Sequence, residues 1–506
     1  MSDTLAAPAP QSTPISSASA TTGPQPRAMA HAIACALVAA ALFVLVGLLT
    51  GRIPVAGGAG WDGSVYLRFV QAIATGSSVD LDPYRLSRIP GFLPAMIAAY
   101  GGMRGESLLQ FQSIINVLML TGSAGLFLYL LMGWGLSARV AWLATACLGL
   151  SWPWLIMPVF YPMLSDHLAL VVAVLSLWSW DRHRTGQLAL LAFASVWIMP
   201  GLFLVPLLLA SVPKNRSHLD TKSATLMPAL SRTLKVLIAL PLVAVGFMSL
   251  RIEDAEIVAH PGNGSSLGWL SLKYLSLTCL LLSLVVVWYV WSRLLTRRQF
   301  WSRLSLRGMA WATLATAGGF ALLALLANWE HNYRGPPILH YLLVQSLAAP
   351  AKPLVAHFLY FGPVFLLAIA AVVRWAHAAS EKSETPLYGL AVVIIAFLPL
   401  LLLGSESRQW IALFPLCVAW LAMQLRSERR LLPLALTAMF LLAPAAVLKS
   451  ATARAVASGL PLTHTDWQVY FGRQGPWMSS DTYLVGLALL AFSLFAWLAM
   501  NRQWRG

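Results

Sequence analysis

AHAIACALVAAALFVLVGLLT, residues 30–50, is followed directly by GRIPVAGGAGWDGSVY, residues 51–66. A helix needs about 20 consecutive apolar residues to cross a bilayer, and the first stretch supplies them. It lacks the basic start of a signal peptide, so we interpret it as a retained first helix; a cleaved signal is the alternative. The second stretch then leaves the membrane as a polar loop that carries Asp62.

Working outward from this start, the apolar pattern recurs along the whole chain. Hydrophobic residues make up 58% of the 506 residues and charged residues 10%, with a mean hydropathy of +0.72, which is typical of polytopic membrane proteins and not of soluble enzymes. A break at Met199-Pro200-Gly201 predicts a re-entrant hairpin within the run 187–212. Further spans are predicted near 108–133, 139–157, 164–180, 233–250, 268–292, 308–328, 353–374, 387–403, 408–425, 431–448 and 484–501.

We therefore expect an all-α polytopic membrane protein, a bundle of about 12–14 transmembrane segments. Residues 28–506 would form one transmembrane domain. Residues 1–27, rich in Ala, Pro, Ser and Thr, predict a disordered cytoplasmic tail. The four cysteines all lie in apolar runs, which indicates buried thiols and argues against a CxxC metal site or a disulfide framework.

The net charge of +16 is distributed unevenly between the two sides of the predicted topology. The segments that we place inside carry 21 Lys/Arg against 6 Asp/Glu, and those outside carry 13 against 12. This excess follows the positive-inside rule, and every basic linker then falls on one side. A nucleic-acid partner is not expected, since no basic stripe interleaved with aromatic residues lies elsewhere in the chain.

The predicted outer loop, residues 51–106, concentrates polar residues in an otherwise apolar chain. Residues 60–90 contain three aspartates and three arginines. Charge gathered beside the bilayer indicates a polar ligand. The apolar segment 89–100 is too short to span and predicts an interfacial helix.

Asp62 is the first catalytic candidate. Gly63 allows close backbone approach, while Trp61 and Tyr66 can hold an aliphatic chain or stack on a sugar ring. A carboxylate at the membrane surface can act as a general base on an acceptor hydroxyl. Asp62 also precedes a plausible helix, 65–74, so an ordinary N-cap role stays open beside the catalytic one.

Arg85 and Arg88 are candidates for a phosphate clamp. They are three residues apart and share a face if this segment is helical, and two guanidinium groups on one face suit a phosphate. Anchoring to anionic lipid headgroups is the alternative. Asp80 and Asp82 have the spacing of divalent-metal ligands, but Asp82 precedes a proline and a turn is favoured, so metal use stays open.

A second group of ionisable residues lies at the predicted outer ends of later spans. Asp166 and His167 follow Ser165 at the start of a span, where they can serve function or simply cap the helix. Glu406 and Arg408 occupy a short corner between two spans, as a structural ion pair or with Arg408 directed at a phosphate. Loop charges are most often solvated, and this applies to the remaining cluster of Glu330, His331 and Arg334.

These residues together resemble the GT-C superfamily of integral-membrane glycosyltransferases. The resemblance rests on Trp61-Asp62-Gly63-Ser64-Val65-Tyr66 after the first helix and on the run 83–90, PYRLSRIP, before a juxtamembrane helix. Asp166 at a span end and the Glu406–Arg408 corner complete it. The loop is similar to a bacterial Asp-Gly-x-x-Tyr branch and to the second mannosyltransferase of glycolipid-anchor assembly. The chain departs from the best-known members in lacking an adjacent acidic pair at Asp62 and a large carboxy-terminal soluble domain.

The resemblance implies a polyprenyl-phosphate sugar donor, a glycan, glycolipid or protein acceptor, and inverting transfer at the periplasmic face of a bacterial inner membrane. Asp62 would be the base. Arg85, Arg88 and Arg408 would hold the donor phosphate, with no cofactor required and a divalent metal left open. Substrate contacts would come from Trp61, Tyr66, Tyr84, Asp166, His167, Glu406, Glu330 and His331.

Two other functions compete with this interpretation. A transporter or flippase of lipid-linked glycans usually carries ionisable residues near the bilayer midplane and has paired inverted halves. Here mid-span positions are nearly free of charge, although the break at Pro200-Gly201 is a transporter-like feature. A polysaccharide polymerase or ligase usually has its basic residues in one large late loop, whereas this chain is charge-rich in an early loop.

Overall fold

The computed structural model describes residues 26–77, 83–199, 201–214, 227–259, 272–327, 338–378 and 385–503. The regular structure in these ranges is helical, with short turns between the helices, and no β-strand occurs in them. The first half contains α1 (Pro26–Thr50), α2 (Trp61–Ala74), α3 (Pro83–Leu86), α4 (Leu93–Tyr100), α5 (Gly105–Gly133), α6 (Ala138–Gly149), α7 (Met157–Phe160), α8 (Asp166–Asp181), α9 (Thr185–Ser195), α10 (Leu204–Ser211), α11 (Pro228–Leu250) and α12 (Asp254–Ala259). The second half contains α13 (Lys273–Leu295), α14 (Arg298–Arg303), α15 (Leu306–Leu326), α16 (Ile338–Leu347), α17 (Lys352–Phe361), α18 (Pro363–Ala378), α19 (Thr385–Leu403), α20 (Phe414–Leu425), α21 (Glu428–Leu441), α22 (Ala445–Ala457), α23 (Thr465–Phe471) and α24 (Ser480–Gln503).

Eight helical stretches in the described residues are long and apolar enough to cross a membrane, or up to ten if each of two bent pairs counts as one span. The expectation of an all-α polytopic membrane protein is confirmed. By this measure the count falls below the predicted 12–14, because several predicted spans form shorter apolar helices. The eight are Pro26–Thr50, Gly105–Gly133, Pro228–Leu250, Lys273–Leu295, Leu306–Leu326, Ser407–Leu425, Glu428–Ala457 and Ser480–Met500.

Two predicted straight spans are broken. The span predicted at 139–157 bends by 72° between α6 and a π-helical turn, η3 (Trp152–Ile156), because Pro153 cannot donate a backbone hydrogen bond there. The span predicted at 353–374 ends at Gly362, which has a φ of 84°. Its first part, α17, instead forms a 94° bent pair with α16. The whole of α16 lies between the predicted spans 308–328 and 353–374, where we expected an outer loop.

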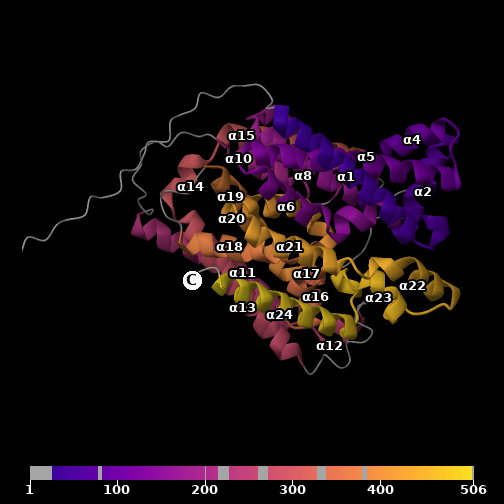
Figure 1. Ribbon diagram of the computed structural model, residues 1–506. Helices are drawn as coiled ribbons and strands as arrows, with labels where there is room; N and C mark the ends of the chain where they lie inside the picture. The colour runs from indigo at the N-terminus through magenta and orange to yellow at the C-terminus, as the bar shows by residue number, and fades with distance from the viewer. Residues whose placement is uncertain are drawn as a thin grey trace, which may run out of the picture.

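Two opposite ends of the molecule are defined by different elements (Figure 1). At one, which we call the α2 end, α2 and α4 lie at the same side of the bundle as α22 and α23. At the other, the α14 end, α14 lies with the carboxy terminus. The helix α8 begins near the first of these ends and its 16 residues extend about 24 Å toward the second.

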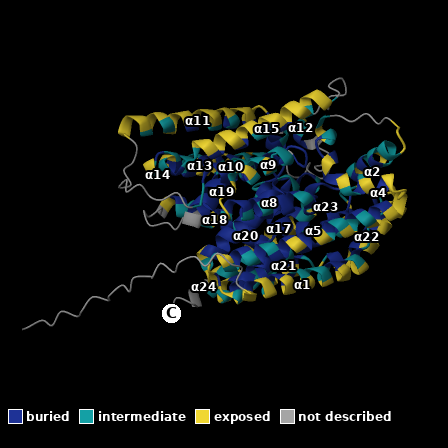
Figure 2. Cartoon of the chain, turned by 90° about the horizontal axis from the view of Figure 1, so that it is seen from above, coloured by how far each residue is buried: buried dark blue, intermediate teal, exposed yellow. Residues whose placement is uncertain are grey.

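The long helices differ in how much of their surface is covered. Exposed residues lie along α11 and α15 on the outside of the bundle, whereas α8, α17 and α20 form its buried centre (Figure 2). In α1, α11, α15 and α24 only 17–22% of the most apolar window is buried, although these windows are strongly hydrophobic. An apolar surface of this kind is what a helix presents to lipid.

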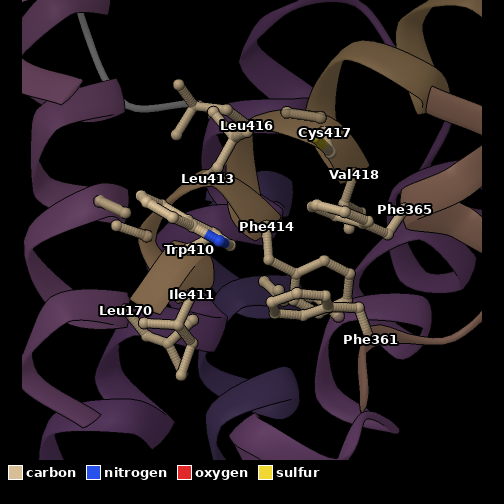
Figure 3. Packing of buried hydrophobic residues seen from close by; sticks show 14 of the residues in the cluster. Leu170, Phe361, Phe365, Trp410, Ile411, Leu413, Phe414, Leu416, Cys417 and Val418 are labelled. Carbon is tan, nitrogen blue, oxygen red and sulfur yellow. The ribbon is translucent and has the colours of Figure 1, made fainter. Parts of the chain in front are cut away.

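The central packing is aromatic. Phe361 at the end of α17 stacks on Phe365 of α18, with 4.5 Å between ring centroids, and on Phe414 of α20 at 5.0 Å (Figure 3). Lipid is itself apolar, so close packing and dispersion contacts, more than removal from water, hold such helices together. This packing fixes the start of α20, and with it the corner that carries Glu406 and Arg408.

Candidate active site

Two glycines hold the loop that carries Asp62 against the chain before α8. Gly60 has a φ of 76°, and a Cβ there would lie 2.3 Å from the Tyr161 ring. A Cβ on Gly63 would lie 2.8 Å from the Cβ of Met163, and Gly63 N donates to the Tyr161 hydroxyl (3.3 Å). Only glycine allows this close approach. Gly60 is therefore the N-cap of α2, and Asp62 lies inside the first turn instead of capping the helix as one of our two interpretations expected.

Arg408 lies at the centre of three carboxylates from distant parts of the chain. Its Nη2 is 3.2 Å from Glu406 Oε1 and 3.7 Å from Asp62 Oδ2, and its Nε is 4.0 Å from Asp166 Oδ2. We call these four residues the Arg408 cluster. One guanidinium faces three carboxylates, so a second positive charge beside the cluster would be stabilised by them.

The three carboxylates differ in their access to solvent. The Asp62 side chain is 43% exposed, compared with 10% for Glu406 and 1% for Asp166. Gln409 also donates to Glu406 Oε2 (2.5 Å), so that carboxylate has two partners. Asp62 is thus the cluster member that an incoming molecule can reach with least rearrangement.

Arg88 supplies a second buried guanidinium beside the cluster. Its side chain is 2% exposed, donates from Nη2 to the Tyr84 hydroxyl, and lies 4.5 Å from the Tyr84 ring centroid. The Arg88 and Asp166 charges act on each other across the site. Arg88 Nε and Nη1 and both Asp166 carboxylate oxygens are buried without a hydrogen-bond partner. Buried polar atoms nearly always have a hydrogen-bond partner, so a ligand or an ordered water molecule bound here would supply the missing hydrogen bonds.

The corner between α19 and α20 is held by side chains of the bent pair α16–α17. His357 Nε2 donates to the Leu401 carbonyl oxygen (3.0 Å), because a carbonyl can only accept. Nδ1 therefore accepts from the Ser407 hydroxyl (2.8 Å). On the other side, Ser405 Oγ donates to Gln345 Oε1 (2.8 Å). These bonds fix Ser405 and Ser407, which are both fully buried and lie on either side of Glu406.

Aromatic residues form one wall of the site. Trp61, 39% exposed, lies 5.3 Å from Trp467 and 5.2 Å from Phe471 between ring centroids, so α23 packs directly on the start of α2. Tyr66 has a different environment: it is buried and stacks on Phe92 at 5.0 Å. Burial raises the pKa of the Tyr66 phenol, which therefore stays protonated at neutral pH. Of the three predicted aromatic contacts, Trp61 and Tyr84 are exposed, whereas Tyr66 is buried.

The remaining predicted residues do not belong to the Arg408 cluster or lie outside the described ranges. The short helix α3 ends at Leu86, and a turn in which Arg88 N donates to Arg85 O (3.0 Å) carries Arg88 inward while Arg85 stays half-buried. His167 is fully buried, with Nε2 3.1 Å from the Tyr161 carbonyl oxygen, next to Asp166 but bonded to the backbone. Four predicted residues lie outside the described residues: Asp80, Asp82, Glu330 and His331.

A metal site does not emerge in the described ranges. Within them no three His, Cys, Asp or Glu side chains are grouped so as to hold a metal ion. The three carboxylates that do converge surround Arg408, whose guanidinium takes the central position.

Sequence reasoning missed several residues that build this site. Trp467 and Phe471 come from α23, some 400 positions after Trp61, and the buried His357, Gln345 and Ser407 support the corner from within. One signal was available for the aromatic wall, since tryptophan and phenylalanine recur in the short polar stretch before the last span. Nothing in the spacing of His357 or Gln345 marks them, because each lies alone in an apolar helix.

Comparisons with protein-family models, curated proteins and solved structures find no match.

Proposed function

We propose that this protein is a membrane glycosyltransferase that takes a sugar from a polyprenyl-phosphate donor. The observation that carries the proposal is the Arg408 cluster, in which a partly exposed carboxylate, Asp62, lies 3.7 Å from the Arg408 guanidinium, together with the buried guanidinium of Arg88 beside the cluster. Sugar transfer from a lipid phosphate needs a base for the acceptor and cations for the departing phosphate. Both lie here at one end of a membrane bundle.

The role that we assign to each residue follows from the exposure of its side chain and from its hydrogen-bond and ion-pair partners. Asp62 is the exposed carboxylate and would accept the proton of the acceptor hydroxyl. Arg88 has two N–H groups without a protein partner and would donate them to a phosphate oxygen. Arg408, already surrounded by carboxylates, would hold Asp62 and Asp166 in place and contribute part of its charge to the phosphate.

The reaction would be a single displacement. The acceptor oxygen attacks the anomeric carbon, its proton passes to Asp62, and the bond from that carbon to the phosphate oxygen breaks with its electron pair on the phosphate. Inversion at the anomeric carbon follows from one displacement. Trp61, exposed beside Asp62, offers a face on which a sugar ring can stack.

The position of the charges favours an enzyme over a transporter. The cluster joins residues at the start of α2, at the start of α8 and before α20, and in Figure 1 α2 lies at one end of the bundle. Transporters instead place their coupling residues near the bilayer midplane. The 94° bend between α16 and α17 is the structural feature that most favours the transporter alternative.

The test is transfer or release of sugar by the purified protein. The wild type, Asp62→Asn and a control, Glu106→Gln, would be supplied with a panel of radiolabelled polyprenyl-phosphate sugars. Glu106 is 81% exposed in the same region and pairs with Arg52, outside the Arg408 cluster. We expect wild type and control to break the sugar–phosphate bond and Asp62→Asn to lose at least about 100-fold, the usual contribution of a general base.

Two results would overturn the proposal. Equal turnover by wild type and Asp62→Asn would remove the assigned base. Movement of an intact lipid-linked sugar across a vesicle membrane, without cleavage of any donor in the panel, would establish the transporter alternative.

A further inference from the structure

A second candidate site lies on the opposite side of the bundle from the Arg408 cluster. A cleft of about 420 Å³ separates α1, α5 and the last turn of α8, toward the α14 end. It extends over residues 29–36 of α1 and 122–129 of α5, about 10 Å along each helix. Its floor is apolar, with Ile33 and Leu126 among the lining residues.

Two glycines of α5 explain why the cleft opens where it does. At Gly125 a Cβ would lie 2.7 Å from the Ala32 carbonyl oxygen, so α1 and α5 touch there backbone to backbone. At Gly122, one turn earlier on the same helix, a Cβ would meet nothing within 4 Å. The two helices pack closely along their length, and the gap lies beside this contact, where Gly122 carries no side chain to fill it. Ile33, 56% exposed, lines the gap.

The cleft ends in aromatic and cationic side chains. Tyr129, Trp178 and Arg182 line that end, and the Arg182 side chain is 45% exposed. Arg184 lies over the Trp178 ring at 4.7 Å from its centroid. Aromatic rings and basic side chains of this kind occupy the level of the lipid headgroups in membrane proteins.

Among the described residues at this end of the cleft, the charge is positive even when Asp181 is counted. Asp181 accepts from Lys214 and from Trp134 Nε1 (2.7 Å), and its other oxygen is 3.9 Å from Arg182 Nε. With Arg182, Arg184 and Lys214 against Asp181, the group carries a net charge of about +2. Asp181 is largely covered, 17% exposed, whereas Arg182 remains open to a ligand.

We propose that this cleft binds one acyl chain of an anionic phospholipid, whose phosphate is held by Arg182. The chain would lie along the apolar floor between α1 and α5, and the headgroup would meet the positive charges at its end. Basic pockets between transmembrane helices on the positively charged side are suited to anionic headgroups. A neutral headgroup gains nothing from the net charge, so the site would distinguish anionic from zwitterionic lipid. This inference does not depend on the proposed function.

The test is lipid retention by the intact protein. The purified, delipidated chain would be exchanged into phosphatidylglycerol or phosphatidylcholine with identical acyl chains, and the lipids that stay bound would be counted by native mass spectrometry. Gly122→Phe fills the cleft, and Arg182→Gln removes its charge. Matched controls are Gly318→Phe, at an exposed glycine of α15 where a Cβ also meets open space, and Arg293→Gln, an arginine at the end of α13.

We expect wild type and both controls to retain one more phosphatidylglycerol than Gly122→Phe. Arg182→Gln should bind phosphatidylglycerol about fivefold more weakly, since a basic residue near the membrane surface contributes about 1 kcal/mol, and should bind phosphatidylcholine unchanged. Melting temperatures of all variants establish that each is folded. Equal retention by wild type and Gly122→Phe would overturn the site, and equal retention of the two lipids by the wild type would overturn its anionic specificity.

Discussion

Replacement of Arg408 by glutamine tests whether one guanidinium holds the cluster together. The change leaves Asp62, Asp166 and Glu406 facing one another without their shared cation. At 4.0 Å and an effective dielectric constant of 20, the attraction between Arg408 and the fully buried Asp166 is about 4 kcal/mol. Asp62 is 43% exposed, so solvent reduces its share to about 1 kcal/mol or less. Repulsion among the carboxylates in the folded wild type offsets part of the total.

We therefore expect Arg408→Gln to destabilise the protein by about 3–5 kcal/mol, the range for breaking a buried ion pair. The assay is thermal unfolding in detergent at pH 7.5 and at pH 5. The loss should shrink at the lower pH, because protonation of the buried Asp166 removes its uncompensated charge. Adding Asp166→Asn to Arg408→Gln should restore part of the stability at pH 7.5.

The matched control is Arg251→Gln. Arg251 is exposed, lies over the Phe247 ring and does not belong to the Arg408 cluster, so its replacement should cost less than about 1 kcal/mol at either pH. A loss below 1 kcal/mol for Arg408→Gln would refute the reasoning, as would a loss of the same size at both pH values.

Three further predictions concern the supports of the site. Gly63→Ala should displace α2 from the chain before α8, since its Cβ would come within 2.8 Å of a neighbouring side chain, and sugar transfer should fall more than the melting temperature, both measured on the same preparation. His357→Leu leaves the buried Ser407 hydroxyl without its acceptor and should cost about 1–3 kcal/mol, of which Ser407→Ala in the same chain recovers part in a double-mutant cycle of unfolding free energies. The Arg454 side chain, hydrogen-bonded to Asp466 (2.7 Å), holds the pKa of Asp466 below its ordinary value. This pair should therefore add stability above about pH 4 that is lost as the pH falls through the folded-state pKa, and Asp466→Asn should remove that acid-side step from a profile of melting temperature against pH.

The helical content and most helix positions follow from the sequence because apolar runs must satisfy their backbone hydrogen bonds internally in a bilayer. The predicted spans at 108–133, 233–250, 268–292 and 308–328 all correspond to single helices in the structure. The broken spans were harder to predict. Pro153 and Gly362 show where each helix can break, but the direction of the following segment depends on its packing partners.

The sequence predicted several residues of the candidate site, but it did not predict how they are arranged. Asp62, Asp166, Glu406 and Arg408 stand out in the sequence as rare charges beside apolar runs, and the structure brings these four together. The wall of Trp467 and Phe471 and the support from His357 were not predicted. Such residues carry no local signal, because a buried histidine or a tryptophan in a short helix has its role only through what packs against it.

The sequence by itself determined that the chain is a multi-pass helical membrane protein and that its scarce charges lie at span ends, because the cost of burying charge in lipid acts on each segment separately. Tertiary structure decided which charges meet. Residues 62, 166 and 408 lie together only because α2, α8 and the start of α20 pack at one end of the bundle. Residue spacing predicts contacts within one helix or turn, and it cannot predict a contact between residues about 350 positions apart. The same packing leaves Arg88 buried with unpaired donors and Asp62 open, a difference in environment between charged side chains that composition cannot encode.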